Sequence, residues 1–273
     1  VSNGKFNLYR HPRVETAVST LLYCSIPPDK TVHFGDWSGG KAGGYWLFNS
    51  LMAETGNREA SWLRKYTSDA PSNLLDCVAP RSGLEPAVPA IASCHLRTTD
   101  WIILRSDFDD PGKISIAAKC GRNNDPHHGH LDQGHISLYW KGCEFLCDHG
   151  SAGYDKAYFD KDRWDYPLAA SIGHNVVMVN GERQSPGKLK DQPWNERIGG
   201  RVVEFRPGKE RDYVQLDPTG AYPGGELKQW RRHIVYEKPS AAVILDEVSC
   251  APGAEIETRF HSAAAQTVRG NFI

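Results

Sequence analysis

The stretch from Asp125 to Asn180 decides the fold and contains most of the residues that could form a functional site. It begins DPHHGHLDQGH (residues 125–135), continues through ISLYW (136–140) and EFLCD (144–148), and ends HNVVMVN (174–180). Six of the eleven histidines of the chain lie between residues 127 and 174. A buried imidazole needs hydrogen-bond partners for both ring nitrogens, so this density favours a functional site over ordinary core packing.

The spacing of these residues predicts that three of them meet. In an extended segment His128–His130, both imidazoles lie on the same face. A hairpin that turns at Lys141–Gly142 returns the chain antiparallel and brings Asp148 near His130. His174 begins a third apolar run and can join them from a neighbouring strand. Two imidazoles and one carboxylate form a ligand set for a divalent metal, with Zn²⁺ expected first. The alternative is that these histidines cap strands and bond backbone carbonyls.

Residues 1–80 predict helices, and residues 81–94 predict a linker. Apolar residues recur at helical spacing in Val14–Tyr23, Tyr45–Met52 and Glu59–Tyr66. Between the first two segments lies FGDWSGG (residues 34–40), which is rich in glycine and aromatic residues. This loop has two interpretations: a helix connection with special backbone angles, or a sugar-facing loop in which Trp37 stacks on a ring.

Residues 95–273 predict an antiparallel β-sandwich. Strands are expected at residues 101–105, 114–118, 136–140, 144–148, 201–205, 213–216, 230–236, 242–246 and 260–261. Turns rich in glycine and proline separate them, which is typical of many short antiparallel strands. The expected fold class is α+β multidomain, with helices followed by a sandwich that we expect to be truncated at Ile273.

Composition limits the classes of partner. The chain has 273 residues, 40% of them hydrophobic, and a net charge of -1 without any basic block, which argues against nucleic acid. It has no apolar run long enough to cross a membrane and no recognisable signal peptide, and it begins with Val1. Its seven scattered cysteines form no disulfide framework, and Cys143 and Cys147 are interpreted as buried apolar residues.

Three ordered motifs resemble the C-terminal region of the heparinase II/III-like polysaccharide lyases. They are HGHLD (residues 128–132), DHG (148–150) and AASIGHNV (169–176), within a resemblance that covers residues 95–262. Alginate lyases and, more distantly, dermatan sulfate epimerases are relatives of that family. The resemblance implies that residues 1–80 are the end of an α/α toroid and that the protein is periplasmic or secreted.

The resemblance also implies roles for individual residues. His130, Asp148 and His174 would hold a metal, often zinc, and His128 would face the substrate at the catalytic centre. In the family, the tyrosine that serves as main base and acid usually comes from the toroid, so we expect it to lie outside this chain. Residues 1–273 alone are therefore expected to show no measurable elimination, because orientation of the substrate needs both domains.

The groups present suit β-elimination from a uronic acid in an anionic polysaccharide. This reaction removes the C5 proton and expels the C4 oxygen, so it needs a neutralised carboxylate, a base and an acid. His128 can bind the carboxylate or transfer a proton. Substrate contacts by hydrogen bonding, ion pairing and stacking are predicted for Tyr154, Tyr158, Arg163, Trp164, Tyr166 and Trp37, with ordinary packing as the alternative for each aromatic ring.

Several functions stay open at the level of sequence. A uronyl C5-epimerase shares the first chemical step, and a cupin-like metal enzyme also uses His-x-His on a β scaffold. A non-catalytic sandwich that binds sugar is the third alternative. The polymer is not specified by the sequence, since heparan sulfate, alginate, ulvan and chondroitin-type chains all contain uronic acids. Formation of a homodimer is also left open.

Overall fold

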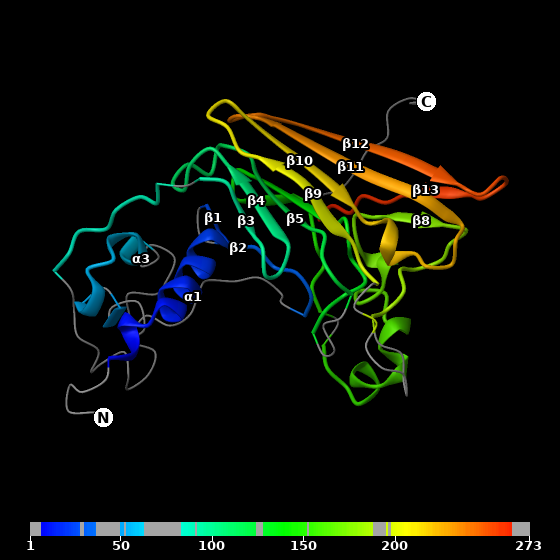
Figure 1. The fold of residues 1–273 in the computed structure, drawn as a ribbon, viewed down its shortest axis with the longest axis horizontal. Coiled ribbons are helices and arrows are strands. Elements are labelled where there is room, and N and C mark those ends of the chain that lie inside the picture. Colours follow the sequence, from blue (N-terminus) through cyan, green and yellow to red (C-terminus); the bar gives the residue numbers. More distant parts are fainter. Residues whose placement is uncertain are drawn as a thin grey trace.

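The computed structural model describes residues 7–27, 30–36, 50–51, 53–62, 83–90, 92–123, 128–151, 153–187, 195 and 198–263. Two antiparallel sheets pack face to face over the second half of the chain, as Figure 1 shows. The first has the order β3-β4-β5-β6-β7, with β3 at Cys94–Leu96, β4 at Trp101–Arg105, β5 at Ser115–Lys119, β6 at Ile136–Trp140 and β7 at Cys143–Leu146. The second has the order β12-β11-β10-β9, with β9 at Arg201–Arg206, β10 at Arg211–Asp217, β11 at Leu227–Glu237 and β12 at Ala241–Cys250.

The alternation of side chains along each strand builds the core between the sheets. Ile102 and Leu104 of β4 join Val214 and Ile234 of the other sheet in one buried cluster. Ile103 points to the opposite side of the five-stranded sheet and belongs to a second buried cluster. The five-stranded sheet is therefore buried on both faces, which explains the continuous apolar run of β4.

An N-terminal segment covers the outer face of the five-stranded sheet. It contains the two-residue strands β1 (Ser25–Ile26) and β2 (Lys30–Thr31), and Ile26, Val32 and Phe34 pack against Ile103, Ala117 and Tyr139. The buried guanidinium of Arg105 donates to the carbonyls of Tyr23 and Ser25, which fixes the start of this segment on β4. This covering segment brings residues 33–36 to the histidine-rich stretch.

Helices are few among the described residues. The helix predicted at Val14–Tyr23 is confirmed by α1 (Pro12–Tyr23). The helix α3 (Arg58–Trp62) begins one residue before the predicted segment Glu59–Tyr66 and overlaps its first half. Leu22, Leu51, Trp62 and Phe108 form a small buried cluster that joins these helices to the β4–β5 loop. Most of Tyr45–Met52 and all of Leu63–Tyr66 lie outside the described residues. The end of an α/α toroid is thus not shown by this arrangement. No helix in the described part of the chain is long and apolar enough to cross a membrane.

Most strand predictions are confirmed, and two need correction. The hairpin turn at Lys141–Gly142 joins β6 to β7, with left-handed φ angles of 50° and 73° at these two residues. The strand predicted at residues 144–148 ends earlier, at Leu146. The prediction of a strand at Phe260–His261 is wrong, because the His261 backbone N–H donates to the side-chain Oδ1 of Asn175 instead of joining a ladder. The strand in that region is β13 (Ile256–Thr258), which pairs with β8 (Val177–Val179).

Candidate metal centre and active-site surface

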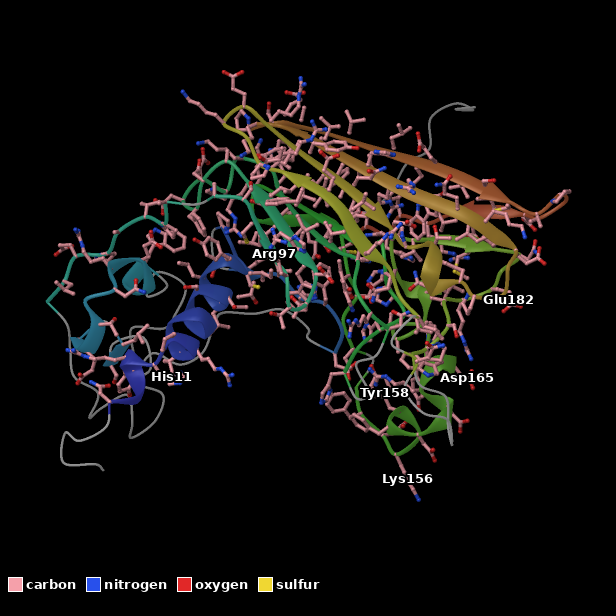
Figure 2. All side chains as sticks on the ribbon, viewed as in Figure 1. His11, Arg97, Lys156, Tyr158, Asp165 and Glu182 are labelled. Atoms are coloured by element: carbon pink, nitrogen blue, oxygen red, sulfur yellow. The ribbon has the colours of Figure 1, made fainter. Side chains whose placement is uncertain are left out.

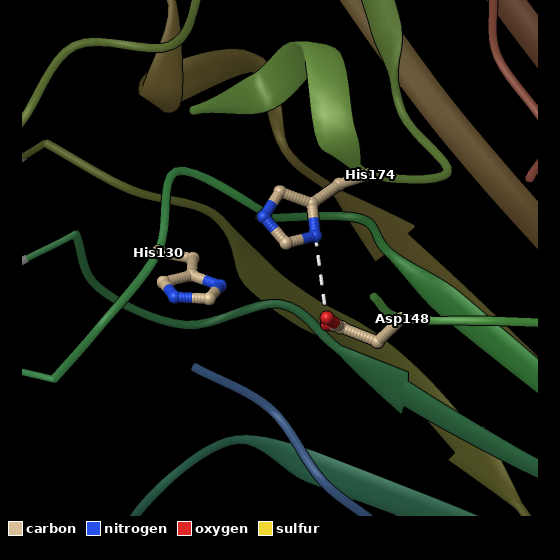
Figure 3. Close-up of side chains that lie close together, drawn as sticks. All are labelled: His130, Asp148 and His174. Atoms are coloured by element: carbon tan, nitrogen blue, oxygen red, sulfur yellow. Dashed lines mark ion pairs between the residues drawn. The ribbon is translucent and has the colours of Figure 1, made fainter. Parts of the chain in front are cut away.

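Three buried side chains from separate segments meet at one point. They are His130, Asp148 and His174, each buried, and one potential ligand atom of each lies within 4.8 Å of the others. Figure 3 shows the three side chains converging from three ribbon segments. His174 Nδ1 lies 3.5 Å from Asp148 Oδ2. Two ligands bound ~2 Å from one tetrahedral ion would be about 3.3 Å apart, so this pair is close to the spacing of a shared ion.

The potential metal-ligand atoms of these three residues lack hydrogen-bond partners. Among the described residues, His130 Nδ1, Asp148 Oδ2 and both ring nitrogens of His174 are buried and make no hydrogen bond. A buried polar atom without a partner costs free energy, so a group that binds all of them is expected. Two imidazole nitrogens and a carboxylate oxygen are ligands that zinc accepts, and the residues therefore fit a divalent metal.

Charge is also concentrated at His130, Asp148 and His174. We call these three candidate ligands the metal group. Burial raises the pKa of Asp148, but the histidines around it, led by His174, outweigh burial and hold the pKa well below its usual range. Burial lowers the pKa of His174, but the Asp148 carboxylate outweighs this and raises it. Burial lowers the pKa of His130, although Asp36 opposes the change. The three groups therefore favour an anionic carboxylate, which is the form that binds a cation.

Local backbone bonds place the three ligand candidates. Asp148 lies two residues after β7, where its Oδ1 accepts from the Gly150 N–H at 2.8 Å. His174 ends the 3-10 helix η5 (Ser171–Gly173) in an extended conformation. The next residue, Asn175, donates through Nδ2 to the carbonyl of Ile136 at 2.7 Å, which attaches this segment to β6.

His135 was not predicted as part of the site, yet it supports it. Its Nδ1 accepts from the Asn175 backbone N–H at 3.1 Å, so the neutral ring carries its proton on Nε2. That Nε2 lies 3.9 Å from Asp148 Oδ2. Burial lowers the pKa of His135 to about 3, so the ring is neutral at ordinary pH. Its sequence signal is the histidine density itself.

Asp36 is the second functional residue that sequence reasoning missed. His128 Nδ1 lies 3.0 Å from its Oδ2, and His130 Nε2 lies 2.9 Å from its Oδ1. Arg163 donates to Oδ1 at 3.0 Å, and the Tyr158 hydroxyl donates to the same oxygen. We call these five residues the Asp36 cluster. Its sequence signal is the FGDW loop, in which Asp36 lies between Gly35 and Trp37.

The carboxylate of Asp36 fixes the tautomers of both histidines. Burial raises its pKa, but hydrogen bonds from His130, Tyr158 and Arg163 outweigh burial and hold the pKa well below its usual range. An ionised carboxylate only accepts hydrogen bonds, so each ring must present N–H to it. His130 then keeps its lone pair on Nδ1, the atom that faces the metal group without a partner. By the same argument Nε2 is the basic nitrogen of neutral His128.

The two histidines of the His-Gly-His motif differ in exposure. The side chain of His128 is 59% exposed, whereas that of His130 is fully buried. Both rings contact Asp36, which agrees with the prediction that they lie on one face. The neighbouring His127 lies outside the described residues.

The aromatic loop supplies part of the predicted substrate surface. Exposed Tyr154 places its hydroxyl 3.4 Å from His128 Nδ1. Tyr158, labelled in Figure 2, lies in η3 (Ala157–Phe159) and is buried instead of exposed. Arg163 is also buried, in η4 (Lys161–Asp165), and its guanidinium stacks over Tyr158 at 4.3 Å.

The remaining predicted contacts have other partners. Tyr166 donates its hydroxyl to the carboxylate of Asp155, at 2.8 and 2.7 Å. The Trp164 ring lies under the Arg163 guanidinium at 5.4 Å. Trp37 lies outside the described residues. Tyr154 is therefore the predicted aromatic side chain that both contacts His128 and reaches solvent in the described part of the loop.

Comparison with known proteins identifies the family. The chain matches the family "Heparinase II/III-like, C-terminal" over residues 91–271, which is well over half of its length. The chain belongs to this family. The matched region of this heparinase II/III-like chain contains all three members of the metal group.

Solved structures show the same fold. A heparinase III superposes with a TM-score of 0.69 at 15% identity, covering 94% of this chain and 35% of that chain. Heparan sulfate lyase HepC from Pedobacter heparinus gives a TM-score of 0.60 at 16% identity, covering 86% of this chain and 32% of that chain. The heparinase II/III-like chain thus spans about a third of the length of these relatives. No curated protein matches it.

Proposed function

We propose that this chain is part of a polysaccharide lyase that cleaves a uronic-acid-containing anionic polysaccharide by β-elimination. The observation that carries the proposal is the exposed imidazole of His128, bonded through Nδ1 to the buried carboxylate of Asp36. This pairing holds the ring in one orientation and one tautomer, with Nε2 as the basic nitrogen. Membership of the heparinase II/III-like family supports the same reaction class.

His128 has two roles open to it in this reaction. As a neutral base or as a proton carrier it would exchange a proton at Nε2, while the charge that develops on the ring is stabilised by Asp36 at 3.0 Å. Protonated, it would pair with the uronate carboxylate and make the C5 proton more acidic. Tyr154, whose hydroxyl lies 3.4 Å from the ring, is placed to contact the same sugar.

The metal in this proposal has a structural role. A divalent ion, with Zn²⁺ as the first expectation, would be held by His130, Asp148 and His174. The ion would join the three separate segments that carry these residues. His130 would connect this ion to Asp36, and through it to His128. The ion would therefore fix the position of the base without contacting the substrate.

Elimination is tested directly by the absorbance of the unsaturated sugar. We expect the full-length protein to release unsaturated product from at least one of heparan sulfate, alginate, chondroitin and ulvan. An epimerase would instead exchange the C5 proton for solvent deuterium without gaining absorbance. A protein that does neither on the whole panel, while folded and loaded with metal, would contradict both activities.

The metal is tested by content and by stability. Asp148→Ala should lose zinc on dialysis and melt at a lower temperature, because a ligand that binds only the folded state stabilises it by about 2.7 kcal/mol at 100 times its Kd. Asp165→Ala, which removes a largely exposed carboxylate, is the control and should keep its metal. Full zinc content in Asp148→Ala would show that the ligand assignment is wrong.

The location of the protein remains part of the proposal. A polymer substrate is too large to enter a cell intact, so a lyase of this class is expected to act in the periplasm or outside the cell. Cysteine pairing gives no support either way, since the cysteines in the described part of the chain are all free thiols.

A further inference from the structure

An exposed phenyl ring lies beside His128, at the end of the 3-10 helix η3 (Ala157–Phe159). It belongs to Phe159, which is 47% exposed and lies in the segment that projects from the sandwich at Lys156 and Tyr158 (Figure 2). Its ring centroid lies 6.0 Å from that of His128. Single exposed apolar side chains are common on protein surfaces, so the significance of this ring depends on its neighbours.

Two tyrosines hold the phenyl ring in position. Tyr154 packs against Phe159 with ring centroids 4.8 Å apart and an angle of 59° between the ring planes. Tyr158 is buried and packs edge-on against the same ring, with centroids 5.5 Å apart. The hydroxyl of Tyr158 in turn donates to Asp36, which fixes its own position. A ring held in this way loses little conformational freedom when a ligand binds, so its exposed face is pre-organised for binding.

The exposed rings of Tyr154 and Phe159 form one continuous surface, which we call the aromatic surface. Polar groups lie at its edge, since the Tyr154 hydroxyl is 3.4 Å from Nδ1 of the exposed His128 ring. A sugar ring carries the same two kinds of group, because its axial C–H groups form an apolar face and its hydroxyls surround that face. The aromatic surface therefore matches a sugar in chemistry.

The size of the aromatic surface also suits a sugar better than a protein partner. One aromatic side chain buries about 150–250 Å² when fully covered, whereas a specific protein interface buries roughly 800 Å² on each partner. The planes of the Phe159 and His128 rings are 81° apart, so one flat sugar ring can stack on only one of them. Because His128 is assigned to polar contacts in the proposed function, stacking falls to Phe159.

We propose that Phe159 is a sugar-binding residue whose phenyl ring stacks on the apolar face of a sugar ring beside His128. The proposal rests on the proposed function, because this sugar would belong to the polysaccharide on which His128 acts. Stacking recognises the shape of the sugar ring and not its charge, so it would not depend on carboxylate or sulfate groups. Phe159 would raise affinity and position the sugar without taking part in proton transfer.

The test measures the binding of probes that resist elimination. Tetrasaccharides of unsulfated heparan, chondroitin and alginate are used after each uronate carboxylate has been reduced to a hydroxymethyl group, so that the C5 proton is no longer acidified. The full-length protein, with His128 intact, is titrated calorimetrically with each probe. Phe159→Ala should bind the preferred probe about tenfold more weakly, as for one lost aromatic contact, and Phe159→Tyr should bind it as the unmodified protein does. Phe145→Ala is the control, since Phe145 is similarly exposed (56%) but lies on β7, outside the aromatic surface.

The outcomes separate sugar stacking from the reaction. A loss in Phe159→Ala that Phe159→Tyr restores supports stacking. An equal loss in Phe145→Ala, a loss that Phe159→Tyr does not restore, or no binding of any probe by the unmodified protein would reject it. Normal binding by Phe159→Ala together with a lower melting temperature would show that protein covers the ring, and would also reject it. A protein that binds as expected yet releases no unsaturated product from uronates would keep the stacking site and reject the lyase.

Discussion

At the scale of single residues, one carboxylate, Asp36, bonds two histidines to which we assign different roles, His128 and His130. Both rings bond Asp36, but one is exposed and the other is buried among candidate metal ligands. We expect His128→Ala to lower turnover about 100-fold or more, the usual contribution of a general base or acid. Turnover on the preferred polymer and zinc content per chain are the two measurements.

Zinc content gives this prediction its control. His128→Ala should keep its metal, because its ring bonds Asp36 and is not among the three grouped ligands. His130→Ala should lose it. If the two variants behave in the opposite way, the roles of the two histidines have been exchanged.

Gly35 allows the covering segment to approach His128. Its φ of 75° is left-handed, and a Cβ at this position would lie 2.2 Å from the His128 carbonyl oxygen. The same carbonyl accepts from the Asp36 N–H at 2.9 Å, so a displaced backbone would move Asp36 as well. We expect Gly35→Ala to lower turnover strongly and to destabilise the fold by more than the ~1–3 kcal/mol of a strained φ alone.

A matched glycine separates the close approach from the backbone strain. Gly56 has a φ of 70°, but a Cβ there would meet no atom within 4 Å. Gly56→Ala should therefore show only the cost of the left-handed angle. Equal stability of the two variants in denaturant titrations would mean that the contact with His128 is unimportant.

The sequence could predict that His130, Asp148 and His174 meet, but not that Asp36 lies beside them. His130, Asp148 and His174 follow from side-chain alternation, one hairpin and one apolar run, all within a short stretch. Asp36 reaches the site because Ile26, Val32 and Phe34 pack on the far side of the sheet, and a tertiary contact of this kind leaves no periodic pattern. Burial of Tyr158 and Arg163 was missed for the same reason, since both bond Asp36.

At the scale of elements, the β4–β5 loop depends on one ionised carboxylate. Asp107 accepts from the N–H groups of Asp109 and Asp110, at 3.1 and 3.0 Å, and from the Lys113 ammonium group. Burial raises its pKa, but the bond from Lys113 and the two backbone bonds outweigh burial and lower it. The folded state therefore binds fewer protons than the unfolded state, whose Asp pKa is about 3.9.

The sign of the pH effect follows from this shift. The stability from Asp107 is fully present above about pH 3.9 and is lost as pH falls through the lower folded-state pKa. Asp107→Asn should therefore be less stable than the unmodified protein at pH 7, by about 1 kcal/mol at this partly exposed site, and the difference should disappear in acid. Urea titrations between pH 2 and 7 measure it, with Asp109→Asn as the control. A difference that grows in acid would contradict this account.

Strands were predictable where their pattern was long. β11 and β12 combine period-two alternation with flanking turn residues, whereas β4 and β5 are short, largely apolar runs between turn residues, and all four were predicted. The two-residue strands β1 and β2 were not, because their pairing is defined by packing on the sheet and not by a pattern of their own. The error at Phe260–His261 has a related cause, since the Asn175 side chain takes the place of a neighbouring strand.

At the scale of the whole molecule, Arg232 connects the four-stranded sheet to the metal group. Its buried guanidinium donates to the carbonyls of Gly134 and Asn175, at 2.7 and 2.5 Å, and pairs with Asp246. Arg232→Met should lower the free energy of unfolding by about 3–5 kcal/mol, because it leaves a mostly buried carboxylate without its charged partner. Denaturant titration measures this loss.

The neighbouring arginine provides the control. Arg231 lies on the opposite face of β11, partly exposed and 3.9 Å from Asp217. Arg231→Met should cost less than about 1 kcal/mol, as for other surface ion pairs. Similar losses in both variants would show that Arg232 acts only through the charge of the strand.

The arrangement of the two sheets was predictable, but the attachment of the N-terminal segment was not. Turn residues at regular intervals predict a sandwich, and the core between the sheets is the one that alternation implies. The continuous apolar run of β4 was a further signal, because it requires cover on both faces of the sheet. Only the structure shows that this cover comes from Cys24, Ile26, Val32 and Phe34.

The contacts of Asp36 also set the order in which the molecule can be completed during synthesis. Its bonds to His128, His130, Tyr158 and Arg163 span 92, 94, 122 and 127 residues. At a translation rate of about 5–20 residues per second, Asp36 leaves the ribosome about 6–25 seconds before its last partner does. Contacts of such high sequence separation also form slowly, since loop closure must precede them. The apolar residues of the covering segment are therefore exposed in the nascent chain until the five-stranded sheet exists, and this is the interval in which a chaperone would bind them.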